Sequence, residues 1–353
     1  MRWSGGMTTY RDAGVDIDAA AHAKQLMAEA VRATYSSAVL AGMGAFGGCF
    51  DLRTALGEAI SDAVLVASTD SVGTKTLVAA ALGRYETLGY DLVNHCVNDI
   101  LVQGARPLFL LDYLAVDRLD PQRAATLVAS VAAACREAGC VLLGGETAQM
   151  PDVYRDGAFE LAGTIVGVVQ RERMLPQNVA VGDVILALPS SGLHTNGYSL
   201  ARRALGAGSA YGYDATPAEL GSRSVGEALL EPHRSYLPAF EQLAAAEIPV
   251  HALAHITGGG VHENLPRVLP KGCGAAIRRG TWDIPPICAL VVRAAGLDEH
   301  EAYRTLNMGL GMLVIVPPDA ADAAVRAVPE ARLVGEVIAS EGVHLIEQAK
   351  HQT

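Results

Sequence analysis

The chain has 353 residues, of which half are hydrophobic and 18% are charged, and its formal net charge is −11. This length exceeds one typical core and predicts about two domains, and the composition is that of a globular chain rather than a disordered one. The negative charge argues against a nucleic-acid surface and against an anionic membrane as a partner. No run of about twenty apolar residues predicts a membrane span.

The cysteines and the N-terminus indicate where the protein works. Six cysteines occur without a CxxC pair, which is typical of reduced thiols in a cytoplasmic protein. The opening segment, "MRWSGGMTTYRDAG", lacks the apolar core of a signal peptide, and Met7 is an alternative start to Met1. We therefore expect a cytoplasmic location.

The first predicted domain, residues 1–170, alternates helices with strands. The elements indicated by apolar periodicity and by Pro and Gly at helix ends are, in chain order, a helix over 19–34, a strand over 63–67, an amphipathic helix from about 91, a strand over 107–116, a helix over 121–139, and strands over 140–145 and 159–170. The polar face of the amphipathic helix, predicted to face water, carries Asp91, Asn94, His95, Asn98 and Asp99.

The second predicted domain, residues 171–353, repeats a plan of strand, turn and helix. The expected elements are a strand over 184–188, a polar turn over 189–196, a helix from about 197, a strand in "HALAH", a glycine-rich turn over 257–260, a helix from about 261, a strand in "TLNMGLGMLVIV", a helix near 319–328 and a strand near 343–346. Hairpin-like segments are mixed in. We therefore predict an α+β fold with a mixed second sheet flanked by helices, not a doubly wound sheet.

Three junctions between a strand and a helix are rich in Gly, Ser, Thr and Asn: "TDSVGTK", "PSSGLHTNG" and "HITGGGVHEN". Backbone N–H groups at such turns bind anions, because the first amides of a helix lack partners. Three of them favour a ligand with several phosphates, or two phosphorylated ligands. None matches the P-loop. "GMGAFGG" holds the letters of the dinucleotide fingerprint, but we predict no strand before it and discount a dinucleotide site.

Three acids lie beside turns or on the polar helix face: Asp70, Asp99 and Glu146, the last in "GGET". Carboxylates around phosphate-binding turns favour Mg²⁺, a hard cation that takes oxygen ligands and bridges to nucleotide phosphates. For any one of these acids, a solvated surface position or a helix cap is the simpler interpretation. Together they favour a magnesium site.

The histidines divide into one catalytic candidate and several structural ones. His194 lies inside the second polar turn, whereas His95, His255 and His262 fit structural roles. No HExxH signature predicts a zinc site, and no GxSxG elbow predicts a hydrolase.

These segments together resemble the aminoimidazole ribonucleotide synthetases, also called phosphoribosylformylglycinamidine cyclo-ligases. The resemblance runs from about Tyr10 to Val337, through "GMGAFGGCFDL", "STDSVGTKTLVA", "VNDILVQGARPLFLLDY", "GGETAQMPDVY", "PSSGLHTNGYSLARR" and "HITGGGVHENLPRVLP". It implies an ATP-dependent and Mg²⁺-dependent ring closure in purine biosynthesis. The substrate would be formylglycinamidine ribonucleotide (FGAM), and the products aminoimidazole ribonucleotide, ADP and phosphate.

The resemblance also implies roles for individual residues. Binding of Mg²⁺ and ATP is expected from the first-domain motifs, with the metal on Asp70, Asp99 and Glu146, and with further contacts from Gly73, Thr74, Lys75 and Asn98. Lys75 would neutralise phosphate charge and Asn98 would orient the reactants. The substrate and its phosphate are expected at Ser190, Ser191, Gly192, His194, Asn196, Thr257, Gly258, Gly259 and Gly260. His194 would transfer a proton or stabilise the phosphoryl group.

Two further implications concern assembly and departures from the family. Members resemble one another in forming a homodimer whose first domains pair their sheets into a barrel-like core, with nucleotide clefts nearby. This chain has Ser71 where glycine is usual, which would cost about 1 kcal/mol if the position needed a positive φ. It also has Arg11 for lysine, His95 for methionine and Thr195 for serine.

Two alternative functions remain open at this point. Selenophosphate synthetase, thiamin monophosphate kinase and the hydrogenase maturation proteins are sister families that bind ATP on the same fold. A nucleotide-binding protein without catalysis is the alternative from another class. The presence of Lys75 and of all three acids argues against a chain without catalysis.

Overall fold

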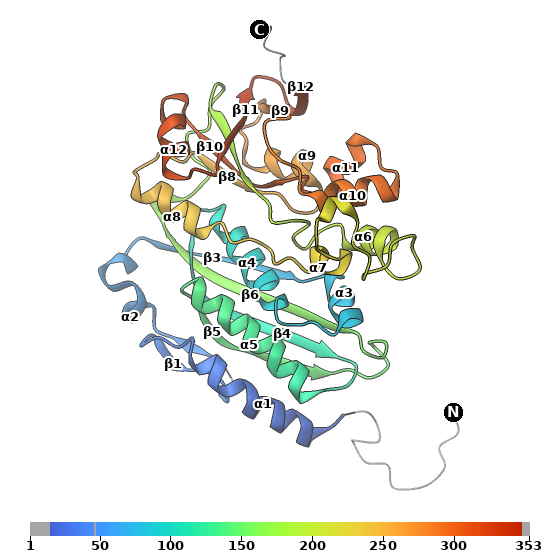
Figure 1. Cartoon of the computed structure of the whole chain (residues 1–353). Coiled ribbons are helices and arrows are strands. Elements are labelled where there is room, and N and C mark those ends of the chain that lie inside the picture. Colours follow the sequence, from blue (N-terminus) through green and yellow to red (C-terminus); the bar gives the residue numbers. More distant parts are fainter. Residues whose placement is uncertain (1–14, 46, 348–353) are drawn as a thin grey trace.

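The computed structural model describes residues 15–45 and 47–347, so that Met1, Met7, Arg11 and Phe46 lie outside the described residues. Two main sheets, each with its own helices, are stacked along the long axis of the molecule (Figure 1). The last strand of the first sheet ends at Gln170 and the first strand of the second begins at Val184. The chain therefore passes from one sheet to the other between these two residues.

The first sheet has four strands. In spatial order they are β3 (Ala63–Ser71), β6 (Phe159–Gln170), β4 (Arg106–Val116) and β5 (Val141–Gln149). β4 and β5 run parallel, and the other neighbours run antiparallel. Helices α4 (Leu88–Leu101) and α5 (Pro121–Glu137) cover one face, and α1 (Ile17–Arg32) packs against α5 (Figure 1). The other face carries Leu65, Leu111 and Tyr113, all exposed.

The second sheet has six strands and is mixed, as predicted. In spatial order they are β12 (Gly342–Glu347), β9 (Gly274–Arg279), β11 (Arg332–Ile338), β7 (Val184–Pro189), β10 (Leu310–Val316) and β8 (Ala252–His255). Only β12 and β9 pair in parallel among these strands. The remaining helices are α2 (Leu52–Leu56), α3 (Lys75–Leu82), α6 (Tyr198–Leu205), α7 (Val225–Leu229), α8 (Leu237–Ala245), α9 (Gly260–Asn264), α10 (Pro286–Ala295), α11 (Glu299–Thr305) and α12 (Ala321–Ala327).

Local signals explain why several elements fall where they were predicted. The Asp120 side chain caps α5 by accepting from the N–H groups of Gln122 and Arg123, and Pro121 occupies the first turn, where no N–H is needed. Asp16 caps α1 in the same way. These caps fix where each helix begins, and the apolar stripe behind them is buried in the core.

Two expectations from the sequence are wrong in detail, and the condition for strain at Ser71 is not met. A short strand, β1 (Val39–Ala41), does precede "GMGAFGG", but it pairs with β2 (Cys49–Phe50) in a separate two-stranded sheet and forms no βαβ unit. β3 extends through Ser71, so that Asp70 lies on a strand rather than in a turn. Ser71 pairs with Ala162 and is not among the residues with positive φ, so the strain anticipated for it does not arise.

The polar face of α4 is the largest departure. Asp91 and Asn98 are fully buried and His95 is 4% exposed, although a water-facing side was predicted. Backbone groups of the second-domain segment 233–236 accept hydrogen bonds from Asn94 and Asn98 and donate to Asp91 and Asn98. These contacts between the domains take the place of water. The amphipathic pattern therefore predicted the helix correctly, but it did not show that the second domain, rather than water, contacts its polar face.

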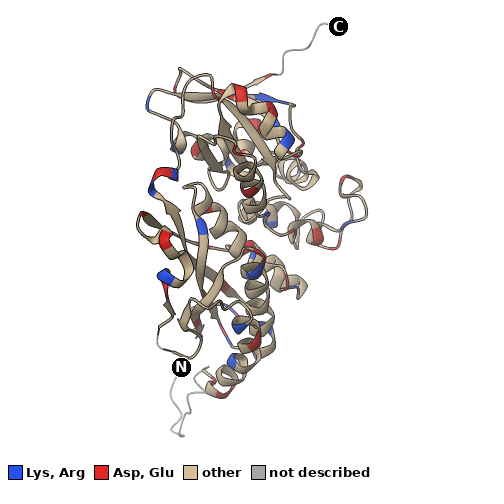
Figure 2. Cartoon of the chain, turned by 90° about the vertical axis from the view of Figure 1, so that its left-hand side faces the viewer, with Lys and Arg blue, Asp and Glu red and all other residues tan. Residues whose placement is uncertain are grey.

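The charged residues, the cysteines and the lengths of the helices can be compared with what the composition indicated. Lys and Arg are interspersed with Asp and Glu over both domains in the view of Figure 2. All six cysteines are free, and four of them, Cys96, Cys135, Cys140 and Cys288, are buried. Within the part of the chain that the structure describes, no helix is long and apolar enough to cross a membrane.

Candidate active site

The two domains meet where α4 faces the turns of the second domain. His95 and Asp99 come from α4, and Asp70 comes from the end of β3. Thr195 lies in the turn that follows β7, and His255 is the last residue of β8. Polar side chains from both domains therefore converge on the face of α4 that is turned away from the first sheet's core.

Asp70 and Asp99 share one imidazole. The Nε2 atom of His95 lies 2.9 Å from Oδ2 of Asp70 and 3.8 Å from Oδ2 of Asp99. The other oxygen of Asp99 lies 2.9 Å from Nδ1 of His255, and Ser68 donates to Oδ2 of Asp99 over 3.2 Å. The structure thus brings together two of the three predicted metal ligands, with histidines where a cation would balance their charge.

Electrostatics keep Asp99 ionised. Burial acts to raise the pKa of Asp99, but the hydrogen bond from His255 and the charges of His255 and His95 outweigh it and lower the pKa. Burial acts to lower the pKa of His95, yet its hydrogen bond to Asp70 and the charges of Asp99 and Asp70 raise it. The pair of carboxylates therefore makes a local negative site in which a cation is favoured.

Glu146 does not join these two acids within one chain. It lies on β5, and the order β3-β6-β4-β5 places two strands between it and Asp70. From the usual strand spacing the separation of β3 from β5 is about 14 Å. The sequence motifs do not reveal the order of the strands in the sheet. Within one chain the three acids therefore do not form the single cluster that was predicted.

Asp112 is an acid that the sequence analysis missed. It lies on β4 in the register row that runs from Asp70 through Gly163 to Gly145. Burial raises its pKa to about 7. A Cβ on Gly145 would come within 2.1 Å of its Oδ1, so glycine is required beside it. The signal was an acid inside the apolar run "LFLLDYL" at the helix-facing position of the strand.

Asp112→Asn is expected to make stability less dependent on pH. The folded chain keeps the proton on Asp112 up to about pH 7, whereas the unfolded chain loses it near pH 4. The unfolded state binds fewer protons in this window, so stability from this group is present below about pH 4 and is lost as pH rises through about 7. The variant should gain roughly 1–2 kcal/mol over the parent at pH 8 and little at pH 4, after allowing for partial exposure. Urea unfolding at both pH values measures this, and an equal difference at both would contradict it.

The three polar turns lie side by side. Thr74 Oγ1 is 3.3 Å from Ser199 Oγ, which joins the first turn to the second. The Oδ1 atom of Asn196 faces Gly258, where an added Cβ would sit 3.3 Å away, which joins the second turn to the third. Asn196 Nδ2 is buried and has no partner among the described residues. The three turns, which are far apart in the sequence, are therefore neighbours in the fold.

Several predicted substrate residues are held by internal hydrogen bonds. Ser190 donates to Asn307 Oδ1 over 2.9 Å, and Asn307 donates to the carbonyl of Gly192 over 2.8 Å. Ser191 donates to the carbonyl of Pro232 over 2.6 Å. Their hydroxyls fix the turn, so a ligand would meet its backbone and the Asn196 amide.

Asn264 does for the third turn what Asn307 does for the second. Its side chain accepts from Thr257 Oγ1 and donates to the carbonyls of Gly258 and Gly260 over 3.2 and 2.8 Å. Gly259 and Gly260 have φ of +90° and +59°, which glycine adopts without strain. The sequence analysis missed both asparagines. Their signal was an amide a short distance from a Gly-rich turn.

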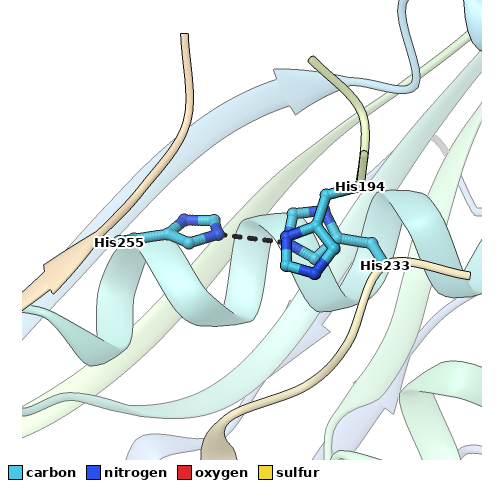
Figure 3. A group of neighbouring side chains, drawn as sticks. All are labelled: His194, His233 and His255. Atoms are coloured by element: carbon cyan, nitrogen blue, oxygen red, sulfur yellow. Dashed lines mark hydrogen bonds between the residues drawn. The ribbon is translucent and has the colours of Figure 1, made fainter. Parts of the chain in front are cut away.

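His194 is buried in a group of three histidines. It comes from the second turn, with φ of +62°, and its ring stacks on that of His233 at 4.0 Å with 17° between planes (Figure 3). The N–H of Ser191 donates to its Nε2 over 3.2 Å, while Nδ1 has no partner among the described residues. Burial holds the pKa of His194 well below its ordinary value, so the ring is neutral.

Lys75 and Asn98 do not point at an open site. The Lys75 ammonium is fully buried and donates to Asp91 Oδ1 and to the carbonyls of Glu231 and His194, at 2.7, 2.6 and 3.4 Å. Asn98 is fully buried as well, and it donates to the carbonyl of Arg234 and accepts from the N–H of Tyr236. In this arrangement both residues join the two domains, which corrects the expectation that they contact the nucleotide directly.

Comparison with known proteins shows which proteins this chain resembles. The AIR synthase related protein N-terminal domain matches residues 54–169, and the corresponding C-terminal domain matches residues 180–347. A phosphoribosylformylglycinamidine cyclo-ligase from Citrifermentans bemidjiense is 47% identical over 310 residues, which cover 88% of each chain. Two crystal structures share the fold at lower identity. One is HypE from E. coli, a hydrogenase maturation protein, with a TM-score of 0.64, 21% identity and 92% of each chain covered. The other is HypE in complex with ATP, with a TM-score of 0.60, 20% identity, and 92% of this chain and 90% of that chain covered.

The fold and the site thus define a two-domain protein of the AIR synthase related class. Within that class, the identity over most of its length decides the relationship. The chain belongs to the phosphoribosylformylglycinamidine cyclo-ligase family. The two HypE structures share its fold at less than half that identity.

Proposed function

We propose that this chain carries out the reaction of its family where its domains meet. The reaction is the ATP-dependent closure of FGAM to 5-aminoimidazole ribonucleotide, with release of ADP and phosphate, in de novo purine biosynthesis. One observation carries the placement: two carboxylates and three polar turns, far apart in the sequence, meet between the domains. Turns of this kind at the starts of helices suit the phosphates of two ligands.

The chemistry asks for orientation more than for a protein nucleophile. A formamide carbonyl is a poor electrophile, and transfer of the γ-phosphoryl group to its oxygen makes that oxygen a leaving group. The amine nitrogen then attacks the same carbon, a C–N bond forms, the C–O bond breaks and phosphate leaves. The protein has to hold the two reacting ends together and balance phosphate charge.

The residues present fit Mg²⁺ at Asp70 and Asp99. Both offer carboxylate oxygens, the ligands this hard cation prefers, and both lie beside one imidazole that already balances their charge. When bound, Mg²⁺ would neutralise charge on the transferring phosphoryl group. Gly73 and Thr74, next to these acids, would supply backbone donors to the nucleotide. Asn196 and residues 257–260 would meet the substrate phosphate.

One assay tests the function as a whole. Phosphate release from ATP should require both Mg²⁺ and FGAM and should not occur with thiamin monophosphate or selenide in place of FGAM. ATP binding without FGAM-dependent release would instead support a nucleotide-binding protein without catalysis. Release with either of the other substrates would move the chain to a sister family.

His194→Ala is expected to impair turnover more than ATP binding. The ring lies in the substrate turn, its neutral form is favoured by burial, and its Nδ1 has no internal partner, so it is suited to act on the substrate rather than to anchor the nucleotide. A fall in kcat of roughly tenfold or more is expected, within the range for one positioned acid–base group. Steady-state kinetics and ATP titration compare the two effects, and equal losses would make His194 a structural residue.

The exposed face of the first sheet supports a homodimer with a barrel-like core. Leu65, Leu111 and Tyr113 lie on the face opposite α4 and α5, where a second copy would cover them. Leu111→Asp should therefore reduce the mass measured by analytical ultracentrifugation from dimer to monomer. Leu333→Asp, at an exposed leucine of β11, is the matched control and should leave the mass unchanged.

A further inference from the structure

One hydroxyl of the second domain touches the imidazole that the two proposed metal acids share. Thr195 Oγ1 lies 2.7 Å from Nδ1 of His95. Nε2 of the same ring lies 2.9 Å from Oδ2 of Asp70 and 3.8 Å from Oδ2 of Asp99. The ring of His95 is therefore held between a carboxylate of the first domain and a hydroxyl of the second.

The contact with Thr195 fixes how the His95 ring is turned. A carboxylate only accepts hydrogen bonds, so Nε2 of His95 donates to Asp70, whereas a hydroxyl both donates and accepts and can pair with Nδ1 in either tautomer. His95 is 4% exposed and Thr195 is 8% exposed, so little water is available to replace this bond. Without the hydroxyl, the ring would lose the contact that keeps Nε2 directed at Asp70.

The same hydroxyl is connected to Asp99 through two further imidazoles. Thr195 Oγ1 lies 3.4 Å from Nδ1 of His233. Nε2 of His233 lies 3.0 Å from Nε2 of His255 (Figure 3), and Nδ1 of His255 lies 2.9 Å from Oδ1 of Asp99. A continuous chain of polar contacts thus runs from Asp70 to Asp99, and Thr195 lies near its middle.

Thr195 belongs to the turn proposed to meet the substrate, and it also lies beside the nucleotide turn. A Cβ added to Gly73 would lie 3.9 Å from the carbonyl oxygen of Thr195. The next residue, Asn196, has a buried amide nitrogen without a partner among the described residues, and its Oδ1 faces Gly258. A ligand that contacts Asn196 therefore meets the turn whose hydroxyl is connected to both metal acids.

We propose that Thr195 is a positioning residue for the metal site. Through His95 on one side, and through His233 and His255 on the other, its hydroxyl holds Asp70 and Asp99 in the orientation in which they share one cation. Groups behind the ligands of a metal orient those ligands, and loss of such a group commonly costs about tenfold or more in metal affinity or activity. The inference rests on the proposed function, in which these two acids bind Mg²⁺.

Thr195→Val tests this role, because valine keeps the shape of threonine and removes both contacts of its hydroxyl. With Mn²⁺ as the probe and ATP present without FGAM, electron paramagnetic resonance should show about tenfold weaker Mn²⁺ binding than in the parent. In FGAM-dependent phosphate release, the Mg²⁺ concentration for half-maximal rate should rise by a similar factor. Thr195→Ser, which retains the hydroxyl, should keep both values close to those of the parent. Should Thr195→Val fail to fold, Thr195→Ala removes the same hydroxyl and takes its place.

Thr34→Val is the matched control. Thr34 is also buried, and its hydroxyl donates to the carbonyl of Val31 over 2.7 Å and accepts from the N–H of Leu142 over 3.0 Å, outside the chain of contacts around Thr195. This variant should be less stable than the parent but should bind Mn²⁺ equally well. Equal weakening of Mn²⁺ binding in Thr34→Val and Thr195→Val would make Thr195 a structural residue and overturn the proposal, as would binding by Thr195→Val that matches the parent.

The two measurements separate this inference from the proposed function. A parent that binds Mn²⁺ but releases no phosphate with FGAM would contradict the proposed function, whereas weaker binding by Thr195→Val, restored in Thr195→Ser, would still support the positioning role. FGAM-dependent release by the parent, with the same Mg²⁺ dependence in Thr195→Val, would overturn the positioning role alone. Absence of Mn²⁺ binding by the parent would overturn it as well, because no metal site would then be present to position.

Discussion

Asp70→Asn is expected to lower FGAM-dependent phosphate release by about tenfold or more while leaving the fold intact. The asparagine keeps the shape of the side chain but removes the negative charge that faces His95 Nε2 at 2.9 Å. With only Asp99 ionised, the proposed Mg²⁺ site loses half of its charge, and tenfold in rate corresponds to about 1.4 kcal/mol of barrier. Steady-state kinetics over a range of Mg²⁺ concentrations measure this loss. The Mg²⁺ concentration for half-maximal rate should rise as well.

Asp62→Asn provides the matched control for this change. Asp62 is an exposed acid immediately before β3, the strand that carries Asp70. Its replacement alters the net charge equally but should leave the rate and the Mg²⁺ dependence unchanged. Normal turnover with normal Mg²⁺ dependence in Asp70→Asn would remove Asp70 from the site. An equal loss in both variants would indicate a general effect of charge rather than a ligand.

Local signals predicted the elements well because caps and periodicity act over a few residues. Pro121 indicated the start of α5, and the alternation of 159–170 matched β6. The turn "PSSGLHTNG" was found from composition, but its anchor Asn307 lies more than a hundred residues away in the sequence. No local pattern indicates such a partner.

The wrong predictions concern residues whose surroundings depend on contacts with the second domain or on the order of the strands. The polar face of α4 looks solvent-exposed in isolation, yet Asp91 and Asn98 are fully buried because segment 233–236 supplies backbone partners to both. In the sequence Glu146 resembles Asp70 and Asp99, because all three acids lie in polar motifs. In the fold, however, β6 and β4 separate its strand from β3, which carries Asp70. The error at Lys75 has a similar cause. A lysine after a glycine-containing turn resembles a phosphate ligand in the sequence, which does not show that its ammonium pairs with the buried Asp91.

Breaking the ion pair between Lys75 and Asp91 is expected to have the largest effect on stability. Lys75 and Asp91 form a fully buried ion pair with 2.7 Å between Nζ and Oδ1, and the same ammonium joins the first domain to the carbonyls of His194 and Glu231. Lys75→Met keeps the length of the side chain but leaves the Asp91 charge without its cation. Burial already raises the pKa of Asp91 to about 6 despite the lysine, so the remaining carboxylate would be strongly disfavoured.

Lys75→Met should therefore lower the free energy of unfolding by about 3–5 kcal/mol, the usual cost of breaking a buried pair by removing one partner. Arg84→Met is the matched control, because its ion pair with Glu227 spans 3.8 Å at the surface and should contribute less than about 1 kcal/mol. Urea unfolding compares the two variants. The double variant Lys75→Met with Asp91→Leu should recover much of the loss, because the uncompensated charge, and not the missing contact, carries most of the cost. If Lys75→Met and Arg84→Met had equal free energies of unfolding, Lys75 would not hold the two domains together.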